Sequence, residues 1–310
     1  MTKPATPICV FAAHALLTQL RALAEELPGV RVNVDIEHVH RMRVASRRLR
    51  IRLALFSECL PSARAAQWKK AVRRLTRALG AARDLDVQCL YVESVRADLP
   101  DAQYAAGIDS LLDYLRQQRR LHQPTLIDIL NRQERNRTLR AIHDALRPWA
   151  KDHADPASPA LHALATHAVE GRLADLLALE TSLDDPGNVA ELHAMRIAAK
   201  HLRYTLETFE ALFDDAVQPA LQALRHVQDL LGDIHDCDVW IDFLPHFLSG
   251  RYTRPRKLAE RAVLEPGIDY LLHTRTTDRA QRFAEMLSAW EGYTQEHLWA
   301  TLLQTVRDGS

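Results

Sequence analysis

Two stretches of the chain carry basic side chains at the spacing of successive helical turns. In each stretch a histidine is followed by three cations, at steps of three, four and three residues. The eight positions are His40, Arg43, Arg47 and Arg50 in the first stretch, and His193, Arg196, Lys200 and Arg203 in the second. On a helix, each set of four falls within an arc of about 80°. Arginine presents a planar fork of donors that matches phosphate oxygens, and lysine a compact charge. This pattern therefore favours binding of an anion with repeated phosphate groups.

The basic stripe borders the apolar face of the same segment and does not lie opposite it. The apolar positions are Val39, Met42, Leu49, Leu53 and Phe56, and they recur at Leu192, Met195, Leu202, Leu206 and Phe209. Cations beside a buried face repel one another unless an anion compensates them. The second stretch keeps the stripe with one Arg-to-Lys change, whereas the outward Arg41, Arg48 and Arg52 become Ala194, His201 and Thr205. We therefore favour a basic groove over a charged face that is merely solvated.

A second basic segment follows the first stretch. Between residues 41 and 77 there are twelve Lys or Arg and one acid, Glu58, although the net charge of the whole chain is zero. Within it, Lys70, Arg73 and Arg77 repeat the same helical steps. Their counterparts in the second half are Gln222, Arg225 and Asp229. We add Lys70, Arg73, Arg77 and Arg225 to the candidate anion site, with a solvated face as the alternative for this segment.

The chain contains an internal duplication of about 150 residues. VHRMRVASRRLRIRLALF at 39–56 is similar to LHAMRIAAKHLRYTLETF at 192–209, and LGAARDLDV at 79–87 is similar to LGDIHDCDV at 231–239. The turn-rich segment 151–160 marks the seam, so we expect repeats at 1–155 and 156–310. In the shorter motif, we expect Gly80 and Gly232 to end one helix and an aspartate to cap the next. The alternative is that an aspartate orients a groove arginine.

The elements that must position these residues are helices throughout. Gly is scarce, with 10 in 310 residues, and apolar residues recur at intervals of three and four positions. Asp35 is the expected N-cap of the first basic helix and Pro61 its stop. Further helices are expected at 7–27, 63–79, 85–98, 101–121, 125–148, 158–180, 217–231, 236–249, 257–272 and 276–305, the last of them broken. The expected fold is all-α, with two four-helix bundles related by pseudo-twofold symmetry around a central basic channel.

Composition excludes several classes of protein. Apolar residues are 47% and charged residues 26%, which argues against disorder. We find no uninterrupted run of 18 apolar residues and no signal peptide, and we expect a cytoplasmic protein without a membrane span. The four cysteines at 9, 59, 89 and 237 have no CxxC spacing, so we expect reduced thiols and no zinc site.

At the four quoted motifs the chain strongly resembles the CHAD family, the conserved-histidine α-helical domain, over roughly residues 5–306. The resemblance implies paired four-helix bundles around a basic cavity, binding of inorganic polyphosphate and association with polyphosphate granules and their proteins. It implies site roles for the eight stripe residues. Metal binding and histidine phosphorylation are older suggestions for this family. His201 and His235 stand where the first repeat has Arg48 and Arg83, which implies weaker binding by the second half at neutral pH.

Three functions remain to be distinguished. The main one is non-enzymatic polyphosphate binding, with no cofactor and no metal. A metal-dependent phosphohydrolase is suggested by the dipeptides His143–Asp144 and His235–Asp236, but such a site needs several more ligands. Nucleic-acid binding would use aromatic side chains to stack bases, and only Tyr204 adjoins a stripe in a chain with 6% aromatics. For His40 and His193, phosphate contact, metal binding and a structural role all stay open.

Overall fold

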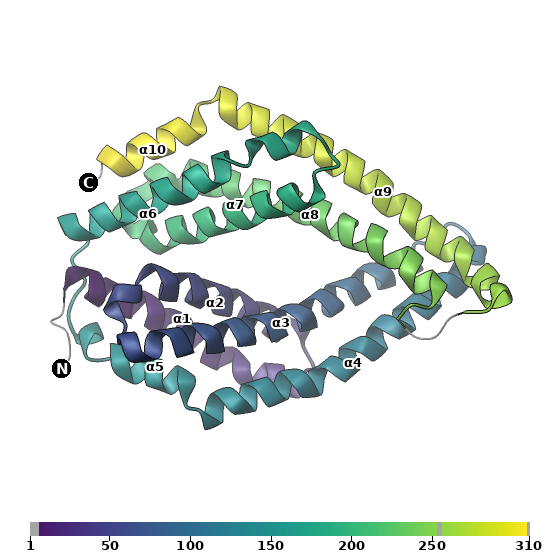
Figure 1. The fold of residues 1–310 in the computed structure, drawn as a ribbon, viewed down its shortest axis with the longest axis horizontal. Helices are drawn as coiled ribbons and strands as arrows, with labels where there is room; N and C mark the ends of the chain where they lie inside the picture. The colour runs from purple at the N-terminus through teal and green to yellow at the C-terminus, as the bar shows by residue number, and fades with distance from the viewer. Residues whose placement is uncertain (1–5, 253–255, 309–310) are drawn as a thin grey trace. The chain divides into compact units, whose positions relative to one another are not determined.

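The computed structural model describes residues 6–252 and 256–308. Within them the chain forms ten α-helices joined by short 3₁₀ turns and loops, and it contains no strand (Figure 1). The all-α prediction is therefore confirmed. The contacts between residues divide the chain into two compact units, and the chain passes from one to the other at residues 89–90, 114–115 and 165–166.

The first unit comprises the residues up to Cys89 together with Leu115–Ala165. It contains α1 (Pro7–Val32), α2 (Ile36–Leu55) and α5 (Thr138–Leu146), with most of α3 (Ser62–Ala97) and of α4 (Ala105–Arg135). Helix α1 packs along α2 (Figure 1). The core holds fully buried side chains from successive helices, among them Leu16, Leu23, Met42, Leu49 and Leu75.

The start of the first basic helix agrees with the sequence prediction. The Asp35 carboxylate accepts a hydrogen bond from the amide of Glu37 at 2.8 Å, which satisfies an otherwise unpaired donor of the first turn. Helix α2 ends at Leu55, before Pro61, and the 3₁₀ turn Ser57–Cys59 follows it. Asp35 therefore sets the position at which the stripe begins on α2.

The cysteines of this unit do not all remain thiols. Cys9 on α1 and Cys59 in the 3₁₀ turn form a disulfide, whereas Cys89 of this unit and Cys237 of the second unit are not disulfide-bonded. The prediction of reduced thiols is wrong for the first pair, because sequence spacing does not show that α1 passes the turn after α2. By joining residues 50 apart, the bond restricts the unfolded chain and stabilises the fold by about 4 kcal/mol.

The second unit comprises Leu90–Tyr114 together with the residues from Thr166 onward. It holds most of α6 (Pro159–Leu177), with α7 (Val189–Phe209), α8 (Gln218–Ser249), α9 (Leu258–Gln295) and α10 (Leu298–Asp308). Helix α8 packs against both α7 and α9 (Figure 1). The start of α4 crosses α9 at two glycines. A Cβ on Gly107 would lie 2.3 Å from the carbonyl oxygen of Leu264, and one on Gly267 would lie 2.2 Å from that of Tyr104. Only glycine allows this approach.

Several helices are longer than the sequence predicts. Helix α3 runs without a break through Gly80, and α8 through Gly232, so neither glycine ends a helix and no aspartate of this motif caps one. Helix α4 continues through Pro124, and α9 extends as one helix from residue 258 to 295. A glycine costs a helix only about 1 kcal/mol, and a proline about 3 kcal/mol. Packing along these long helices offsets both costs.

Helix α1 is the one described helix that is long and apolar enough on average to cross a membrane. The search for an uninterrupted apolar run in the sequence did not find α1, because its apolar residues are interrupted by a few polar ones. Its mean hydropathy is nevertheless high enough to meet the criterion. The buried core helix of a water-soluble unit meets the same criterion. In this structure the side chains of Leu16, Leu20 and Leu23 are buried inside the first unit. Composition alone therefore does not assign α1 to a membrane.

Candidate functional site

The first stripe faces the motif glycine on the neighbouring helix. A Cβ on Gly80 of α3 would lie 3.7 Å from Nε of Arg43 on α2. The guanidinium of Arg43 reaches Oδ1 of Asp84 at 3.4 Å, and that of Arg83 reaches Oε1 of Glu37 at 3.2 Å. These contacts set the antiparallel register of α2 and α3. Glycine leaves space for the arginine side chain across α3, where a large side chain would displace it.

The register indicates which residues of α3 lie at the level of each stripe residue of α2. In an antiparallel pair, each step forward along one helix is a step backward along the other. From the level of Arg43 and Gly80, Arg47 therefore lies level with Thr76, and Arg50 with Arg73. Lys70 and Arg77 lie one turn to either side of Arg73 on α3. The first-half residues chosen from sequence are thereby brought to one pair of helices.

The second unit repeats this arrangement on α7 and α8. A Cβ on Gly232 would lie 3.6 Å from Nε of Arg196. One turn away, the Nδ1 atoms of His193 and His235 are 3.2 Å apart. The same counting places Lys200 level with Gln228, and Arg203 with Arg225. Both halves thus place a motif arginine beside a motif glycine. In each half the stripe histidine lies near the equivalent position of the neighbouring helix, which is Arg83 in the first unit and His235 in the second.

The stripe residues are shielded to different extents. Half-buried positions are His40, Arg43, Arg47, His193, Arg196, Lys200 and Arg203, and exposed ones are Arg50, Lys70, Arg73, Arg77 and Arg225. The side chain of Arg43 is 22% exposed and that of Arg203 17%. A charge that is partly removed from water interacts more strongly with an approaching anion than a fully solvated one. We therefore expect the half-buried cations to interact more strongly with an anion than the exposed ones.

The aspartates of the shorter motif bind arginines. Asp84 contacts Arg43, as the alternative reading of the motif expects. Asp86 is buried and accepts a hydrogen bond from Nε of Arg119 on α4 at 2.6 Å. In the second unit Asp238 pairs with Arg279 of α9. Burial raises the pKa of the Asp86 carboxyl, and Arg119 opposes that shift. The last aspartate of each motif thus anchors the following long helix.

The histidines are held in the neutral form. Burial, and then the charge of Arg83, lowers the pKa of His40, while Glu37 opposes the shift. Burial, and then Arg196 and Lys200, lowers the pKa of His193. For His235, burial, then His193, then the same two cations lower the pKa to about 4. All three are therefore neutral near pH 7.

The two units differ in charge. Level with His40 the first unit has Arg83, whereas the second has His235. In addition, Oε1 of Glu207 lies 3.8 Å from Nε of Arg203, and Asp229 replaces Arg77. The second stripe is consequently the less positive one. Sequence reasoning left Arg83 out of the candidate site, although its alignment with a histidine in the second motif was the signal that could have included it.

Groups suited to metal chemistry are scarce. Over residues 6–252 and 256–308, no three His, Cys, Asp or Glu side chains gather as a metal site. Nδ1 of His143 lies 3.2 Å from its neighbour Asp144, and both are exposed. His235 of the other dipeptide faces His193 instead.

Comparison with known proteins decides the family. The CHAD domain profile matches residues 14–245, which include both stripes. The chain belongs to the CHAD family. Among solved structures, this CHAD chain is similar to the CHAD domain from the plant Ricinus communis, with a TM-score of 0.63 and 22% identity over 97% of this chain and 91% of that one.

A second solved structure agrees on the fold. PptA from Streptomyces chartreusis has a TM-score of 0.63 and 16% identity, over 92% of this CHAD chain and 100% of that chain. No curated protein sequence matches significantly. At these identities the likeness shows a shared CHAD fold.

Proposed function

We propose that this CHAD protein binds inorganic polyphosphate along its basic stripes and performs no chemistry on it. The observation that carries the proposal is the duplicated arrangement, in which each unit seats a motif arginine over a motif glycine beside further cations. Membership of the CHAD family supports it, because binding of polyphosphate is general to that family.

The physical argument is charge compensation along a row. Arg43, Arg47 and Arg50 present donors on successive turns of α2, about 5 Å apart along the helix. A chain of linked phosphates carries charge at every unit, so one ligand can meet several turns. Each charge-assisted contact also relieves the repulsion between neighbouring cations. A single phosphate would relieve only part of it, so we expect long chains to bind more tightly than orthophosphate.

Several finer expectations belong to the same proposal. They are a common basic channel for both stripes, association with polyphosphate granules and their proteins, and a cytoplasmic location. Nucleic-acid binding by the same cations is the competing function.

Salt dependence tests the proposal. We expect the affinity for long-chain polyphosphate, measured by fluorescence anisotropy, to fall steeply with salt. By analogy with nucleic-acid complexes, six to ten phosphate contacts imply a loss of about 10³- to 10⁵-fold between 50 and 200 mM salt. Polyphosphate should displace a single-stranded RNA at equal phosphate concentration, and no orthophosphate should be released. Affinity independent of salt, preference for RNA, or hydrolysis would each overturn the proposal.

The histidine at position 235 gives a test within the second unit. His235→Arg makes this level resemble the first unit, where Arg83 lies beside His40. Since His235 is neutral at pH 7.5, we expect the variant to bind polyphosphate about three- to tenfold more tightly there. The gain should shrink as the pH falls. Bound phosphate raises the pKa of His193 and His235, so the wild type takes up protons on binding and binds more tightly at lower pH.

The matched control is His273→Arg, which adds the same charge at an exposed position on α9. Affinity should be measured from pH 7.5 to 5.5 for the three proteins. Equal gains for the two variants, or a wild-type affinity that does not rise with falling pH, would refute this account of the second stripe.

A further inference from the structure

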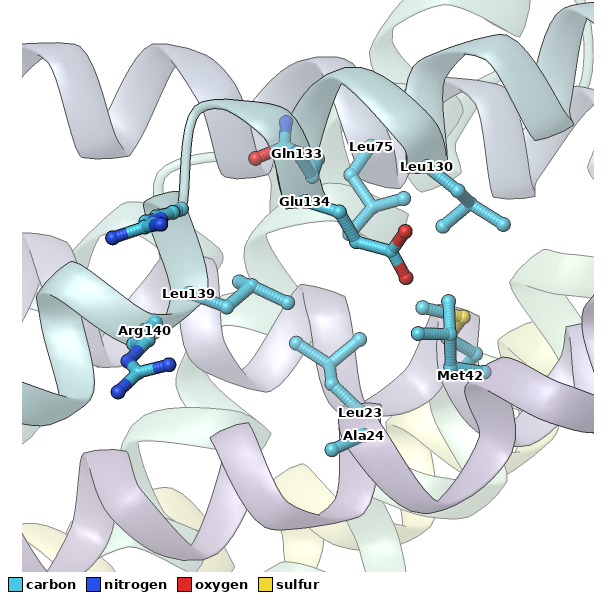
Figure 2. Close-up of a pocket in the computed structure, with 11 residues that line it drawn as sticks. Leu23, Ala24, Met42, Leu75, Leu130, Gln133, Glu134, Leu139 and Arg140 are labelled. Atoms are coloured by element: carbon cyan, nitrogen blue, oxygen red, sulfur yellow. The ribbon is translucent and has the colours of Figure 1, made fainter.

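The first unit contains an apolar cavity whose lining includes no stripe residue. Its volume is about 340 Å³, and its walls include Leu23, Met42 and Leu130 (Figure 2). Glu134 directs its carboxylate toward these side chains, but Arg31 already compensates that charge at 2.8 Å. Apolar walls of this kind accept many ligands and do not select one. Groups that select a ligand lie instead in the second unit, on side chains that neither stripe uses.

The second unit contains a stack of aromatic rings at the C-terminal end of α8. The ring of Phe243 stacks with those of Phe247 and Tyr252, at centroid distances of 6.1 and 5.0 Å and interplanar angles of 25° and 16°. Tyr114 of α4 packs against all three rings. The guanidinium of Arg256 lies over the ring of Phe247, 4.5 Å from its centroid. Side chains of the same unit thus cover Phe247, and the stack ends at Tyr252.

Tyr252 is the exposed ring of this stack. It is 43% exposed, whereas Phe247 is 1% exposed and Phe243 is half-buried. One face of the Tyr252 ring lies against Phe243, and the His246 ring stands nearly perpendicular to it, with the two centroids 6.4 Å apart. The accessible surface of Tyr252 therefore includes the opposite face of its ring. A flat aromatic group placed on that face extends the stack in the offset geometry that aromatic rings prefer.

A cation without a carboxylate partner lies beside the exposed ring. Arg251 precedes Tyr252 in the chain, and its Nη1 donates to Nε2 of His246, the ring that stands against Tyr252, at 3.0 Å. Among the residues that the structure describes, no carboxylate pairs with the exposed Arg251. Its other guanidinium donors are therefore available to an anion. The same charge repels an organic cation, which an aromatic face would otherwise attract.

These observations select a ligand with a flat aromatic part and a negative charge close to it. We propose that Tyr252 and Arg251 bind a nucleoside phosphate, with the base stacked on the exposed face of Tyr252 and a phosphate held by Arg251. Every nucleobase has a π-face, so stacking accepts any base, and the phosphate supplies the charge that Arg251 requires. The site uses no stripe residue and is independent of the polyphosphate proposal.

Fluorescence anisotropy of etheno-ADP, titrated with the full chain, tests the proposal. We expect saturable binding that unlabelled ADP displaces. Tyr252→Phe keeps the ring and should retain the affinity, whereas Tyr252→Leu keeps an apolar side chain without a π-face and should bind at least about fivefold more weakly. Arg251→Gln should weaken ADP binding about threefold and leave adenosine binding unchanged, since adenosine has no phosphate.

The charge control is Arg172→Gln, which removes an exposed arginine of α6 in the same unit and should leave etheno-ADP affinity unchanged. Circular dichroism should show that all variants are folded, and Tyr252→Leu should bind polyphosphate like the wild type. Absence of saturable binding by the wild type, or equal affinity of folded Tyr252→Leu and Tyr252→Phe, would overturn the proposal.

The stripes are the other place where a nucleotide phosphate could bind, and a variant separates the two sites. Etheno-ADP affinity should survive joint replacement with alanine of Arg43, Arg47, Arg196 and Arg203. If this variant loses etheno-ADP together with polyphosphate, the nucleotide binds at the stripes and the assignment to Tyr252 is wrong. If it loses polyphosphate alone, the two sites are separate, as proposed.

Discussion

Replacing Arg43, Arg47, Arg196 and Arg203 together with alanine is expected to abolish polyphosphate binding while the far-ultraviolet circular dichroism stays helical. All four are half-buried cations of the stripes on α2 and α7. Hydrogen bonds to charged groups contribute about 1.5–3 kcal/mol each, so losing four should weaken affinity at least about 1000-fold. The measurement is anisotropy of labelled long-chain polyphosphate at fixed low salt.

A control variant removes the same number of charges elsewhere. Arg132, Arg135, Arg172 and Arg307 lie outside the stripes and pair with nearby carboxylates. Their joint replacement with alanine changes the net charge equally and should weaken binding only slightly, through the long-range field. If the stripe variant and this control behave alike, the stripes are not the binding site.

The two halves of the stripe variant should contribute unequally. The pair Arg43→Ala and Arg47→Ala should cost more affinity than Arg196→Ala and Arg203→Ala. Each pair has an acid nearby, but Asp84 beside Arg43 is 65% exposed, whereas Glu207 beside Arg203 is 11% exposed and is less screened by water. The first unit also has Arg83 close to His40, where the second unit has the neutral His235. The opposite order would contradict the charge difference that we assign to the two units.

Asp86→Ala is expected to destabilise the first unit by about 3–5 kcal/mol, because it leaves the guanidinium of Arg119 buried without its carboxylate. The side chains of Asp86 and Arg119 are 4% and 10% exposed and 2.6 Å apart. Urea unfolding followed by circular dichroism measures the effect on the free energy of unfolding. Since the chain has two units, the transition of the first unit should be resolved before a free energy is assigned.

Asp84→Ala serves as the matched control, since it belongs to the same motif. Its side chain is 65% exposed and lies 3.4 Å from Arg43, so its loss should cost less than about 1 kcal/mol. Replacing Asp86 and Arg119 together with leucine and methionine should recover much of the lost stability. Equal effects of Asp84→Ala and Asp86→Ala would show that the buried pair has no special importance.

The local features of this fold could be predicted from the sequence. Apolar residues that recur every three or four positions indicate helices. The N-cap at Asp35 follows from its residue type and its position before the first helical turn. The sequence could not show that α3 and α4 continue past the residues at which we expected helices to end. Gly80 and Pro124 carry local signals for interruption, but packing of α3 and α4 along their whole length outweighs those signals.

For the candidate site, the sequence shows which residues share one helical face but not what lies opposite them. That Gly80 accommodates Arg43, and that Asp86 reaches Arg119 on α4, depend on the register between helices. Periodicity contains no information about that register. The Cys9–Cys59 bond was missed for the same reason, because it joins two elements that meet only after folding.

The segment Leu90–Tyr114 belongs to the second unit although it lies between two segments of the first, and this affects folding during synthesis on the ribosome. Tyr104 stacks on Tyr270, with 4.6 Å between ring centroids, and Gly107 meets the backbone near Gly267. These partners emerge roughly 160 residues later, which at about 5–20 residues per second is a delay of roughly 8–30 s. During that interval the nascent start of α4 exposes its apolar side chains. We therefore expect folding of the chain to finish only after α9 has left the ribosome.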